Sequence, residues 1–436
     1  MKRRFSCVLM VLLICLSVCA TTYVSAETEA ANPPQIKSEG AILIDMDSGR
    51  VLFEKDADKR LYPASTTKIM SAILFLENLN LDSVVVASQE AVMSIPAGGS
   101  NIGILEGEQL TVEQLLYGML VASANEACNV LAEYMCGDVD TFVARMNEKA
   151  KEIGMKDTKF LNAHGLHSPE HYTTARDLAI LARYAMQNEK FREIVATQQY
   201  VIEPTAKYPE RRILNNTNYL INGRQNGSYL YSNATGIKTG YTSQAGNCLV
   251  ASASKAGTNL IAVALHAMPQ TEGIYSFIDC KALFEYGFAN YETKVIVEPD
   301  TVIAEADVIE AQGTDFVTLV SKSEKEALLP VNADMNQITK TVTLNERIAA
   351  PVKKGDVLGT ATYSYDGYDL CSVELVASTD VERDVFIFVM NRIFDFFNLM
   401  WVKIPLIILI VLFLVLYIIR RINRRKRRRY LRSRRY

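Results

Sequence analysis

Residues that could cross-link this chain or hold a metal ion are few. Among its 436 residues there are eight cysteines, of which Cys7, Cys15 and Cys19 lie close to the N-terminus. The remaining cysteines are scattered and odd in number, so they do not form a disulfide framework. Cys128 and Cys136 are expected on one helix, about 12 Å apart by helical rise, which is too far for a disulfide bond. We therefore expect buried free thiols.

Histidine is also scarce, with four in the whole chain. The spacing of His164, His167 and His171 resembles that of zinc ligands, but neither an acidic residue nor a cysteine completes the set. His266 falls at the end of a predicted strand. We expect structural histidines, and neither a metal ion nor an organic cofactor.

Acidic residues are absent from the C-terminal stretch 420–436, which contains ten arginines and one lysine. The N-terminus adds Lys2, Arg3 and Arg4, so the formal net charge of −3 conceals an acidic middle. An acidic body would repel a polyanion, which argues against nucleic acid as the partner. The chain has no internal repeat, and only the basic tail is of low complexity.

The length predicts two globular units with additional segments, because 436 residues exceed one ordinary hydrophobic core. Residues 1–26 combine a basic start, an apolar run and a small-residue site, so they are predicted to be a secretory signal peptide. A lipoprotein signal at Cys19 is a weaker alternative, because Val18 stands where a small residue is expected. The mature chain is expected to begin near Glu27 and to work outside the cytoplasm.

Residues 34–291 are predicted to form an α+β domain. Strands are expected at both ends of this stretch, over 40–45, 50–54, 234–240, 246–254 and 258–266. Capping patterns and apolar periodicity predict helices over 111–121, 126–137, 140–153 and 174–188, and another over 275–286. Because strands at the two ends enclose a mostly helical middle, the terminal strands are expected to share one sheet.

The rest of the chain changes character twice. Residues 292–379 are rich in Val, Thr and Ile and predict a small all-β domain. Residues 380–400 predict an amphipathic juxtamembrane helix, and residues 401–419 are apolar and long enough for a transmembrane helix. The positive-inside rule then places the basic tail, 420–436, in the cytoplasm, with binding of anionic lipid or protein as a lesser role. We expect a single-pass protein of the cell membrane whose larger part is extracytoplasmic.

The segment Pro63–Lys68 offers a hydroxyl and an amine side by side. Ser65 and Lys68 are three positions apart on a predicted helix, so their side chains project from the same side of its first turn. A serine hydroxyl is a weak nucleophile until a base takes its proton, and Lys68 is the candidate base. Its amine must then be substantially neutral, which burial would favour by lowering the pKa.

A second motif, Ser123-Ala124-Asn125, falls in the tight connection between two predicted helices. Its Ser123 hydroxyl could relay protons with Lys68, and the Asn125 amide could hold a peptide group of a substrate. Helix capping is the plain structural alternative for both residues.

A third motif, Lys238-Thr239-Gly240, falls on a predicted strand. Lys238 supplies positive potential, Thr239 can bind a carboxylate, and Gly240 lets a substrate backbone approach the strand edge. Each of the three motifs is a weak signal alone. In this order, in a secreted chain, they form the serine acyltransferase set of penicillin-binding proteins and class A β-lactamases.

The chain resembles the D-alanyl-D-alanine carboxypeptidases, the low-molecular-mass penicillin-binding proteins, over about residues 40–291. The stretches that carry the resemblance are Pro63-Ala64-Ser65-Thr66-Thr67-Lys68-Ile69-Met70, Ser123-Ala124-Asn125, Asn162-Ala163-His164-Gly165-Leu166, Thr174-Ala175-Arg176-Asp177, Asn216-Thr217-Asn218 and Lys238-Thr239-Gly240-Tyr241-Thr242. The β domain and its amphipathic helix are similar to that family's second domain. Many relatives stop there, whereas this chain adds an apolar span and an Arg-rich tail.

The resemblance implies a β-lactamase/transpeptidase-like catalytic domain, in which a sheet is combined with a helical subdomain. It makes Ser65 the acylated nucleophile, Lys68 its general base and Ser123 the proton relay. It implies an oxyanion hole from the backbone N–H groups of Ser65 and Tyr241, one such donor being worth about 3 kcal/mol of barrier. The substrate-binding residues that follow are Asn125, Lys238, Thr239, Gly240 and Tyr241.

The function expected from this set is removal of the terminal D-alanine from the pentapeptide stems of peptidoglycan, through an acyl-enzyme. Penicillin, which mimics the D-alanyl-D-alanine end, is expected to trap the same serine. One alternative is a β-lactamase, which would hydrolyse its penicilloyl-enzyme rapidly. The other is a wall-binding scaffold with a vestigial site. The sequence carries no signal for an oligomeric state.

Overall fold

The computed structural model describes residues 31–96, 98–224, 226–268 and 273–433. The predicted signal peptide therefore lies outside the described residues. The chain divides into two compact units. The first ends at Lys294 and includes Leu328–Asp334, and the second consists of Val295–Ala327 with the chain from Met335 onward.

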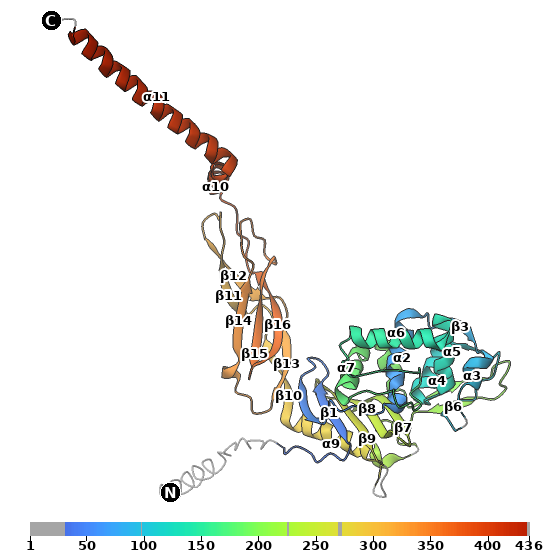
Figure 1. Cartoon of the computed structure of the whole chain (residues 1–436). Coiled ribbons are helices and arrows are strands. Elements are labelled where there is room, and N and C mark those ends of the chain that lie inside the picture. Colours follow the sequence, from blue (N-terminus) through green and yellow to red (C-terminus); the bar gives the residue numbers. More distant parts are fainter. Residues whose placement is uncertain (1–30, 97, 225, 269–272, 434–436) are drawn as a thin grey trace, which may run out of the picture. The chain divides into compact units, whose positions relative to one another are not determined.

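The first unit contains a five-stranded antiparallel sheet in the order β2-β1-β9-β8-β7 (Figure 1). Strands from the beginning and the end of the unit lie next to each other in it, which confirms the predicted α+β arrangement. Their bounds are β1 (Gly40–Asp45), β2 (Val51–Lys55), β7 (Ala234–Thr242), β8 (Gly246–Lys255) and β9 (Thr258–Ala267). β7 is an edge strand of this sheet.

Each face of the sheet has its own hydrophobic core. On one face lies α9 (Tyr275–Asn290), whose Phe277, Leu283 and Phe284 pack with strand residues such as Leu249 and Leu260. The other face packs against the helical subdomain, where the core includes Ile69, Phe75 and Phe142. Figure 1 shows α9 on one side of the strands and the other helices of the unit on the opposite side.

The helical subdomain carries the first two motifs. Its helices are η1 (Ala64–Thr67), α2 (Lys68–Asn78), α3 (Gln89–Met93), α4 (Val112–Val121), α5 (Asn125–Cys136), α6 (Val139–Glu152), α7 (Ala175–Ala185) and α8 (Glu189–Ala196). Two small hairpins pair β3 (Val84–Val86) with β4 (Gln109–Thr111), and β5 (Gln199–Ile202) with β6 (Arg212–Asn215). A short turn of helix, η2 (Gly227–Tyr229), precedes β7.

Local signals fixed most of these boundaries. Thr111 and Gln114 form the capping box expected at the start of α4, and Gly137, with φ of 86°, ends α5. The helix predicted over 174–188 is α7, which ends slightly earlier, at Ala185. α8 lies beyond that range and was not predicted; Asn188 caps it by accepting a hydrogen bond from the backbone N–H of Phe191.

The second unit is built around another antiparallel sheet, in the order β11-β12-β16-β15-β14. Its core contains Val317, Leu319, Val373 and Leu375. Along each strand, the residue between the two buried ones is more exposed. The strands are β11 (Val302–Asp307), β12 (Phe316–Ser321), β14 (Thr339–Leu344), β15 (Val357–Tyr365) and β16 (Tyr368–Ala377), with η3 (Met335–Gln337) between them. A separate two-stranded sheet pairs β10 (Tyr291–Val297) with β13 (Lys325–Pro330).

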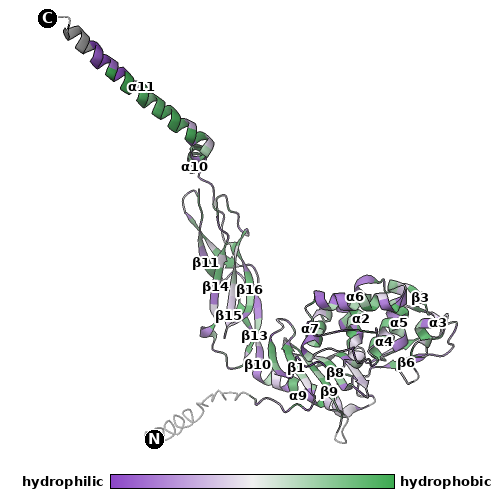
Figure 2. Ribbon diagram, viewed as in Figure 1, coloured by the Kyte–Doolittle hydropathy of each residue, from purple (hydrophilic) through white to green (hydrophobic). Residues whose placement is uncertain are grey.

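Two helices follow the second sheet. α10 (Val385–Asn398) begins later than predicted, because Asp384 caps it by accepting a hydrogen bond from the N–H of Ile387. α11 (Met400–Ser433) is unbroken, and 28 of its residues, Met400–Arg427, form a helix long and apolar enough to cross a membrane. Figure 2 shows its hydrophobic part giving way to hydrophilic residues toward the C-terminal end.

The five cysteines in the described part of the chain are free, as predicted. Cys128, Cys248 and Cys280 are buried, whereas Cys136 and Cys371 are half-buried. The expectation of complete burial is therefore wrong for these last two. Cys128 and Cys136 do lie on one helix, α5.

Candidate active site

Ser65 lies in a tight turn between two backbone segments that leave it almost no room. It belongs to η1 rather than to the first turn of the long helix, and α2 begins only at Lys68. A Cβ on Gly240 of β7 would lie 3.0 Å from the Ser65 nitrogen. On the other side, a Cβ on Gly165 would lie 1.8 Å from the Ala64 carbonyl oxygen. The absence of side chains at these two glycines is thus what allows the turn to fit.

Lys68 is fully buried beside Ser65 and makes three hydrogen bonds. Its Nζ lies 2.9 Å from Ser65 Oγ, 2.7 Å from Asn125 Oδ1 and 2.7 Å from the backbone oxygen of His164. Burial lowers the pKa of Lys68 to about 8. With such a pKa, about a tenth of the amines are neutral at about pH 7, ready to accept a proton.

The second motif reaches the same cleft, but only one of its side chains contacts Lys68. Asn125 is the first residue of α5, and its N–H donates to the Ser100 oxygen at 2.9 Å while its Oδ1 accepts from Lys68. Ser123 has a φ of 64°, is almost fully buried and lines the cleft. Within the described residues it makes no hydrogen bond to Lys68, so its part in a proton relay stays a prediction.

The third motif occupies the edge strand. Lys238 is buried, and burial, followed by the positive charge of Lys68, lowers its pKa well below the ordinary value. Its Nζ donates to the backbone oxygen of Thr239 at 3.0 Å. The Thr239 hydroxyl lies 2.6 Å from that of Thr217, whereas the Tyr241 side chain is 58% exposed. Tyr241 can therefore contribute to the cleft chiefly through its backbone.

These residues surround one cleft of about 330 Å³. Six of the eight side chains or backbones singled out in the sequence line it, while Lys68 and Lys238 lie buried beneath. Sequence reasoning missed the segment 98–100, the residue Tyr219 and the start of α9. Gly165, Leu166, Thr217 and Thr242 also line the cleft, and they lie in stretches that the resemblance had marked. The lining includes Ser65, Gly98, Gly99, Ser100, Ser123, Asn125, Thr217, Tyr219, Thr239, Gly240, Tyr241 and Phe277.

The loop that carries His164 is built around Asn162. Its Oδ1 accepts from the N–H groups of His164 and Gly165, and its Nδ2 donates to the Leu166 oxygen at 2.9 Å. This arrangement aims the His164 carbonyl at Lys68, a backbone contribution that the sequence did not reveal. The His164 ring itself is buried, which lowers its pKa to about 3.

The histidine pattern does not assemble a metal centre in the described part of the chain, where no group of three or more potential ligands is placed to hold an ion. His171 Nε2 lies 3.0 Å from the Thr67 hydroxyl, and the ring packs edge-on against Phe160. Burial lowers the pKa of His171 to about 4. His164 and His171 are thus neutral packing residues near neutral pH.

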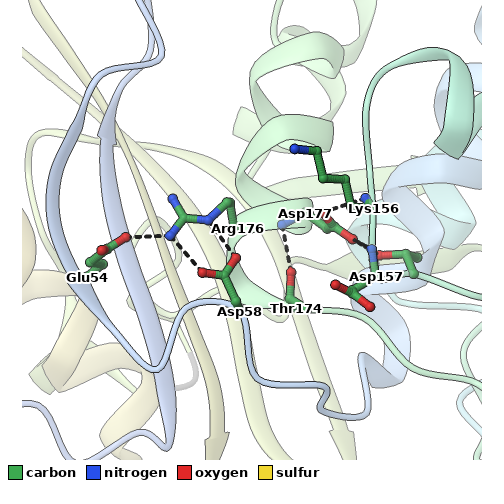
Figure 3. A network of polar contacts seen from close by, with 8 residues as sticks. Glu54, Asp58, Lys156, Asp157, Thr174, Arg176 and Asp177 are labelled. Atoms are coloured by element: carbon green, nitrogen blue, oxygen red, sulfur yellow. Dashed lines mark hydrogen bonds and ion pairs between the residues drawn. The ribbon is translucent and has the colours of Figure 1, made fainter.

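The Thr174–Asp177 motif holds the segment 156–158, which precedes this loop in the chain (Figure 3). The Asp177 carboxylate accepts from the N–H groups of Lys156 and Asp157 and from the Thr158 hydroxyl. Thr174 caps α7 by accepting from the Asp177 N–H at 3.0 Å. The start of α7 is thereby tied to the segment that leads into the His164 loop.

Arg176, the remaining charged residue of that motif, faces the other way. Its guanidinium binds Asp58 Oδ1 at 2.6 Å and Glu54 Oε2 at 2.6 Å (Figure 3). The segment after β2, which leads to Ser65, is thus joined to the same helix end. The motif has a structural part in the site and contacts no residue of the cleft lining.

Comparisons with known proteins agree with this geometry. The family model described as D-alanyl-D-alanine carboxypeptidase matches residues 27–269, and the model described as penicillin-binding protein 5, C-terminal domain, matches residues 291–383. The D-alanyl-D-alanine carboxypeptidase DacF of Bacillus subtilis is 32% identical over 395 residues, which cover 90% of this chain and 98% of DacF. DacC of Escherichia coli is 30% identical and covers 86% of this chain and 91% of DacC.

Solved structures give the same result. The crystal structure of penicillin binding protein 5 from Haemophilus influenzae has a TM-score of 0.65 at 29% identity, covering 81% of this chain and all of that one. The Streptococcus pneumoniae protein described as a peptidoglycan synthesis regulatory factor (PBP3) has a TM-score of 0.70 at 26% identity, covering 80% of this chain.

Proposed function

The chain belongs to the D-alanyl-D-alanine carboxypeptidase family, as a serine-type hydrolase, and we propose that Ser65 is the nucleophile with which it removes D-alanine from peptidoglycan stems. The Ser65 oxygen attacks the carbonyl between the two terminal D-alanines, and Lys68 accepts its proton. The tetrahedral intermediate collapses, D-alanine leaves as a protonated amine, and an ester on Ser65 remains. Water then hydrolyses the ester and restores the serine.

The observation that carries this proposal is the contact between Lys68 Nζ and Ser65 Oγ, at 2.9 Å. Three oxygen acceptors fix the amine in place, and burial lowers its pKa to about 8. A fixed amine that is partly neutral at working pH meets the two requirements of a general base, which are reach and a matched pKa.

Substrate binding is proposed to use the free edge of β7. A peptide in extended form can pair with an edge strand through its backbone, and Thr239 and Gly240 of this strand line the cleft. Lys238 and Thr239 would hold the terminal carboxylate, and the N–H groups of Ser65 and Tyr241 would stabilise the oxyanion. Asn125, whose Oδ1 is bound to Lys68, has its amide NH₂ to offer to a substrate carbonyl.

Ser123 is proposed to carry the proton from Lys68 to the leaving amine. In its support, the residue lines the cleft on the side of Asn125 and is nearly fully buried. A rotation of its hydroxyl toward bound substrate would complete the relay. The role therefore belongs to the loaded enzyme.

We propose the domain organisation that the sequence suggested. A signal peptide (1–26) precedes the catalytic domain (34–291), the β domain (292–379), a juxtamembrane helix (380–400), a transmembrane helix (401–419) and a cytoplasmic tail (420–436). The exposed apolar side chains of α10, such as Phe386 and Phe394, support attachment to a membrane surface. The apolar part of α11 supports a single crossing of the membrane. The arginines beyond it support a cytoplasmic location of the tail.

Mass spectrometry after treatment with penicillin tests the nucleophile. We expect one adduct on Ser65 in the folded protein and none in Ser65→Ala, and D-alanine release from a synthetic pentapeptide only by the former. An adduct elsewhere, or none, contradicts the assignment. Steady-state turnover of nitrocefin would instead indicate a β-lactamase, which hydrolyses its acyl-enzyme quickly.

A further inference from the structure

Glu126 follows the second motif and is buried close to the reacting groups. It lies in the first turn of α5, next to Asn125, and only 2% of its surface is exposed. Its Oε1 accepts a hydrogen bond of 2.6 Å from the backbone N–H of Ile102. Its Oε2 is buried and has no hydrogen-bond partner among the described residues. A carboxyl group in such a place is costly, so its presence calls for a physical explanation.

The hydrogen bond from Ile102 joins Glu126 to one side of the cleft. We call residues 98–102 the lip, because Gly98, Gly99 and Ser100 line the cleft. The lip is fixed to α5 at two neighbouring points, through Asn125 N–H to the Ser100 oxygen at 2.9 Å and through Ile102 N–H to Glu126.

The lip also lies against the substrate-binding amide. A Cβ on Gly99 would lie 3.1 Å from Asn125 Nδ2, the group expected to face a substrate. A shift of the lip by a few tenths of an ångström would therefore change the space around that amide. Of the two bonds that prevent such a shift, the one from Ile102 depends on a side chain and can be removed by mutation.

The second effect of Glu126 is electrostatic. Burial raises the pKa of its carboxyl, while the backbone N–H groups of Ile102, of Glu126 itself and of Ile104, and the positive charge of Lys68, oppose this. In return, Glu126 favours the charged form of Lys68. Cys128, two residues further along α5, interacts electrostatically with both groups, but burial raises the pKa of its thiol to about 11 and keeps it neutral.

We propose that Glu126 is a positioning residue for the reaction: its buried carboxyl group fixes the lip against the start of α5 and, when ionised, favours the charged form of Lys68. The inference rests on the proposed function, in which Lys68 is the base. Glu126 touches neither the nucleophile nor the substrate, so it acts through Ile102 and Lys68. The two effects call for different substitutions.

Glu126→Gln separates charge from contact, because the amide oxygen can still accept from Ile102. Without the negative charge, Lys68 loses its proton more readily, so the acidic limb of the acylation rate by penicillin moves to lower pH. We expect acylation at about pH 6 to become about three- to tenfold faster, which corresponds to a pKa change of about half to one unit. The KM for a pentapeptide should change less than about twofold.

Glu126→Ala removes the contact as well. We expect hydrogen exchange of the Ile102 amide to become at least about tenfold faster, because this half-buried N–H has lost its acceptor. A shift of the lip would change the space around the Asn125 amide, so the KM for the pentapeptide should also rise. Amide exchange is measured on the resting protein, so it tests the lip without any catalysis.

Glu133→Gln is the matched control, with the same change on the same helix about 10 Å away by helical rise. Its carboxylate accepts from the Ser88 hydroxyl, and Glu133 is not among the groups that shift the pKa of Lys68. We expect a wild-type pH profile and wild-type exchange at Ile102.

A Glu126→Gln profile that coincides with the wild type overturns the electrostatic role, and unchanged Ile102 exchange in Glu126→Ala overturns the role in the lip. A wild-type protein that neither acylates nor releases D-alanine would instead overturn the proposed function, while the exchange result would still decide on the lip.

Discussion

The nucleophile side and the strand side of the cleft each bury a lysine, and they hold it differently. Lys68 has three oxygen acceptors from three separate segments, at 2.7 to 2.9 Å. Lys238, equally buried, donates to the backbone oxygen of its own neighbour, Thr239. Burial lowers the pKa of both, to about 8 for Lys68 and well below the ordinary value for Lys238.

The difference separates two tasks that the same side chain can perform. Lys68 is immobilised at a fixed distance from Ser65, as a proton acceptor must be. Lys238 keeps donors available on its side of the cleft, and a substrate carboxylate would supply the acceptors and the negative charge that it lacks. Binding should thus raise the pKa of Lys238 and charge it, whereas Lys68 acts while neutral.

The largest effect is expected when the base can no longer lose its proton. Lys68→Arg keeps a cation at the position, but a guanidinium stays protonated, so acylation of Ser65 by penicillin should fall by about 10²–10⁴-fold. Rapid-quench mass spectrometry measures the rate. Lys59→Arg, at an exposed lysine that pairs with Glu39, should leave it unchanged. A Lys68→Arg rate within tenfold of the wild type would mean that another base takes the proton.

Gly165→Ala tests how closely Gly165 packs against the backbone next to Ser65. The added Cβ would lie 1.8 Å from the Ala64 oxygen, and φ is +89°, so we expect a loss of about 2–4 kcal/mol in the free energy of unfolding. Urea denaturation followed by circular dichroism measures it. Gly154→Ala is the control, since Gly154 has a φ of +90° with nothing within 4 Å, and only the backbone cost, about 1 kcal/mol, should appear. Equal losses in the two variants would show that the contact with Ala64 is unimportant.

Lys238→Gln tests the strand side of the cleft, where Lys238 is proposed to bind the terminal carboxylate of the substrate. Without the cation, the kcat/KM for a pentapeptide with a free terminal carboxylate should fall by about 10- to 100-fold, as expected for loss of a charge-assisted contact. A pentapeptide with an amidated C-terminus serves as the matched substrate. It should be a poor substrate for both proteins, and to the same degree. If the variant lost activity equally on both peptides, Lys238 would not be binding the carboxylate.

The effect of pH on acylation can be measured without any substitution. The amine of Lys68 must be neutral in the free enzyme, and its pKa is lowered to about 8, so acylation should increase with pH up to about 8. Below that value the rate should fall by about tenfold per pH unit, since the neutral fraction does. Stopped-flow measurements with a penicillin between about pH 5 and 9 would reveal the limb. A limb near pH 6 would instead point to a group other than Lys68.

Much of the catalytic unit could be predicted because its signals are local. Capping residues such as Thr111 and Gly137 mark where helices begin and end, and alternation of apolar residues marks the strands. The helix predicted over 174–188 is α7, whereas α8 was not predicted, because its 8 residues are too few to show a clear apolar period.

The site was predictable in its residue types and less so in its contacts. The motifs identified Ser65, Lys68 and Asn125, which the fold brings together. The carbonyl of His164 could not be found, because any residue supplies the same backbone oxygen. The lip was missed for a similar reason, since its link to Glu126 joins positions 24 apart without a sequence pattern.

The position of β7 at the edge of the sheet has a consequence for the stability of the whole unit. A substrate or inhibitor that pairs with it adds a sixth strand to the described five, so the occupied protein gains hydrogen bonds that the empty one leaves to water. An acyl group held on Ser65 would keep that strand in place until hydrolysis. The melting temperature should therefore rise on acylation and return to its initial value as the ester is hydrolysed. Its change with time would thus report the hydrolysis of the acyl-enzyme.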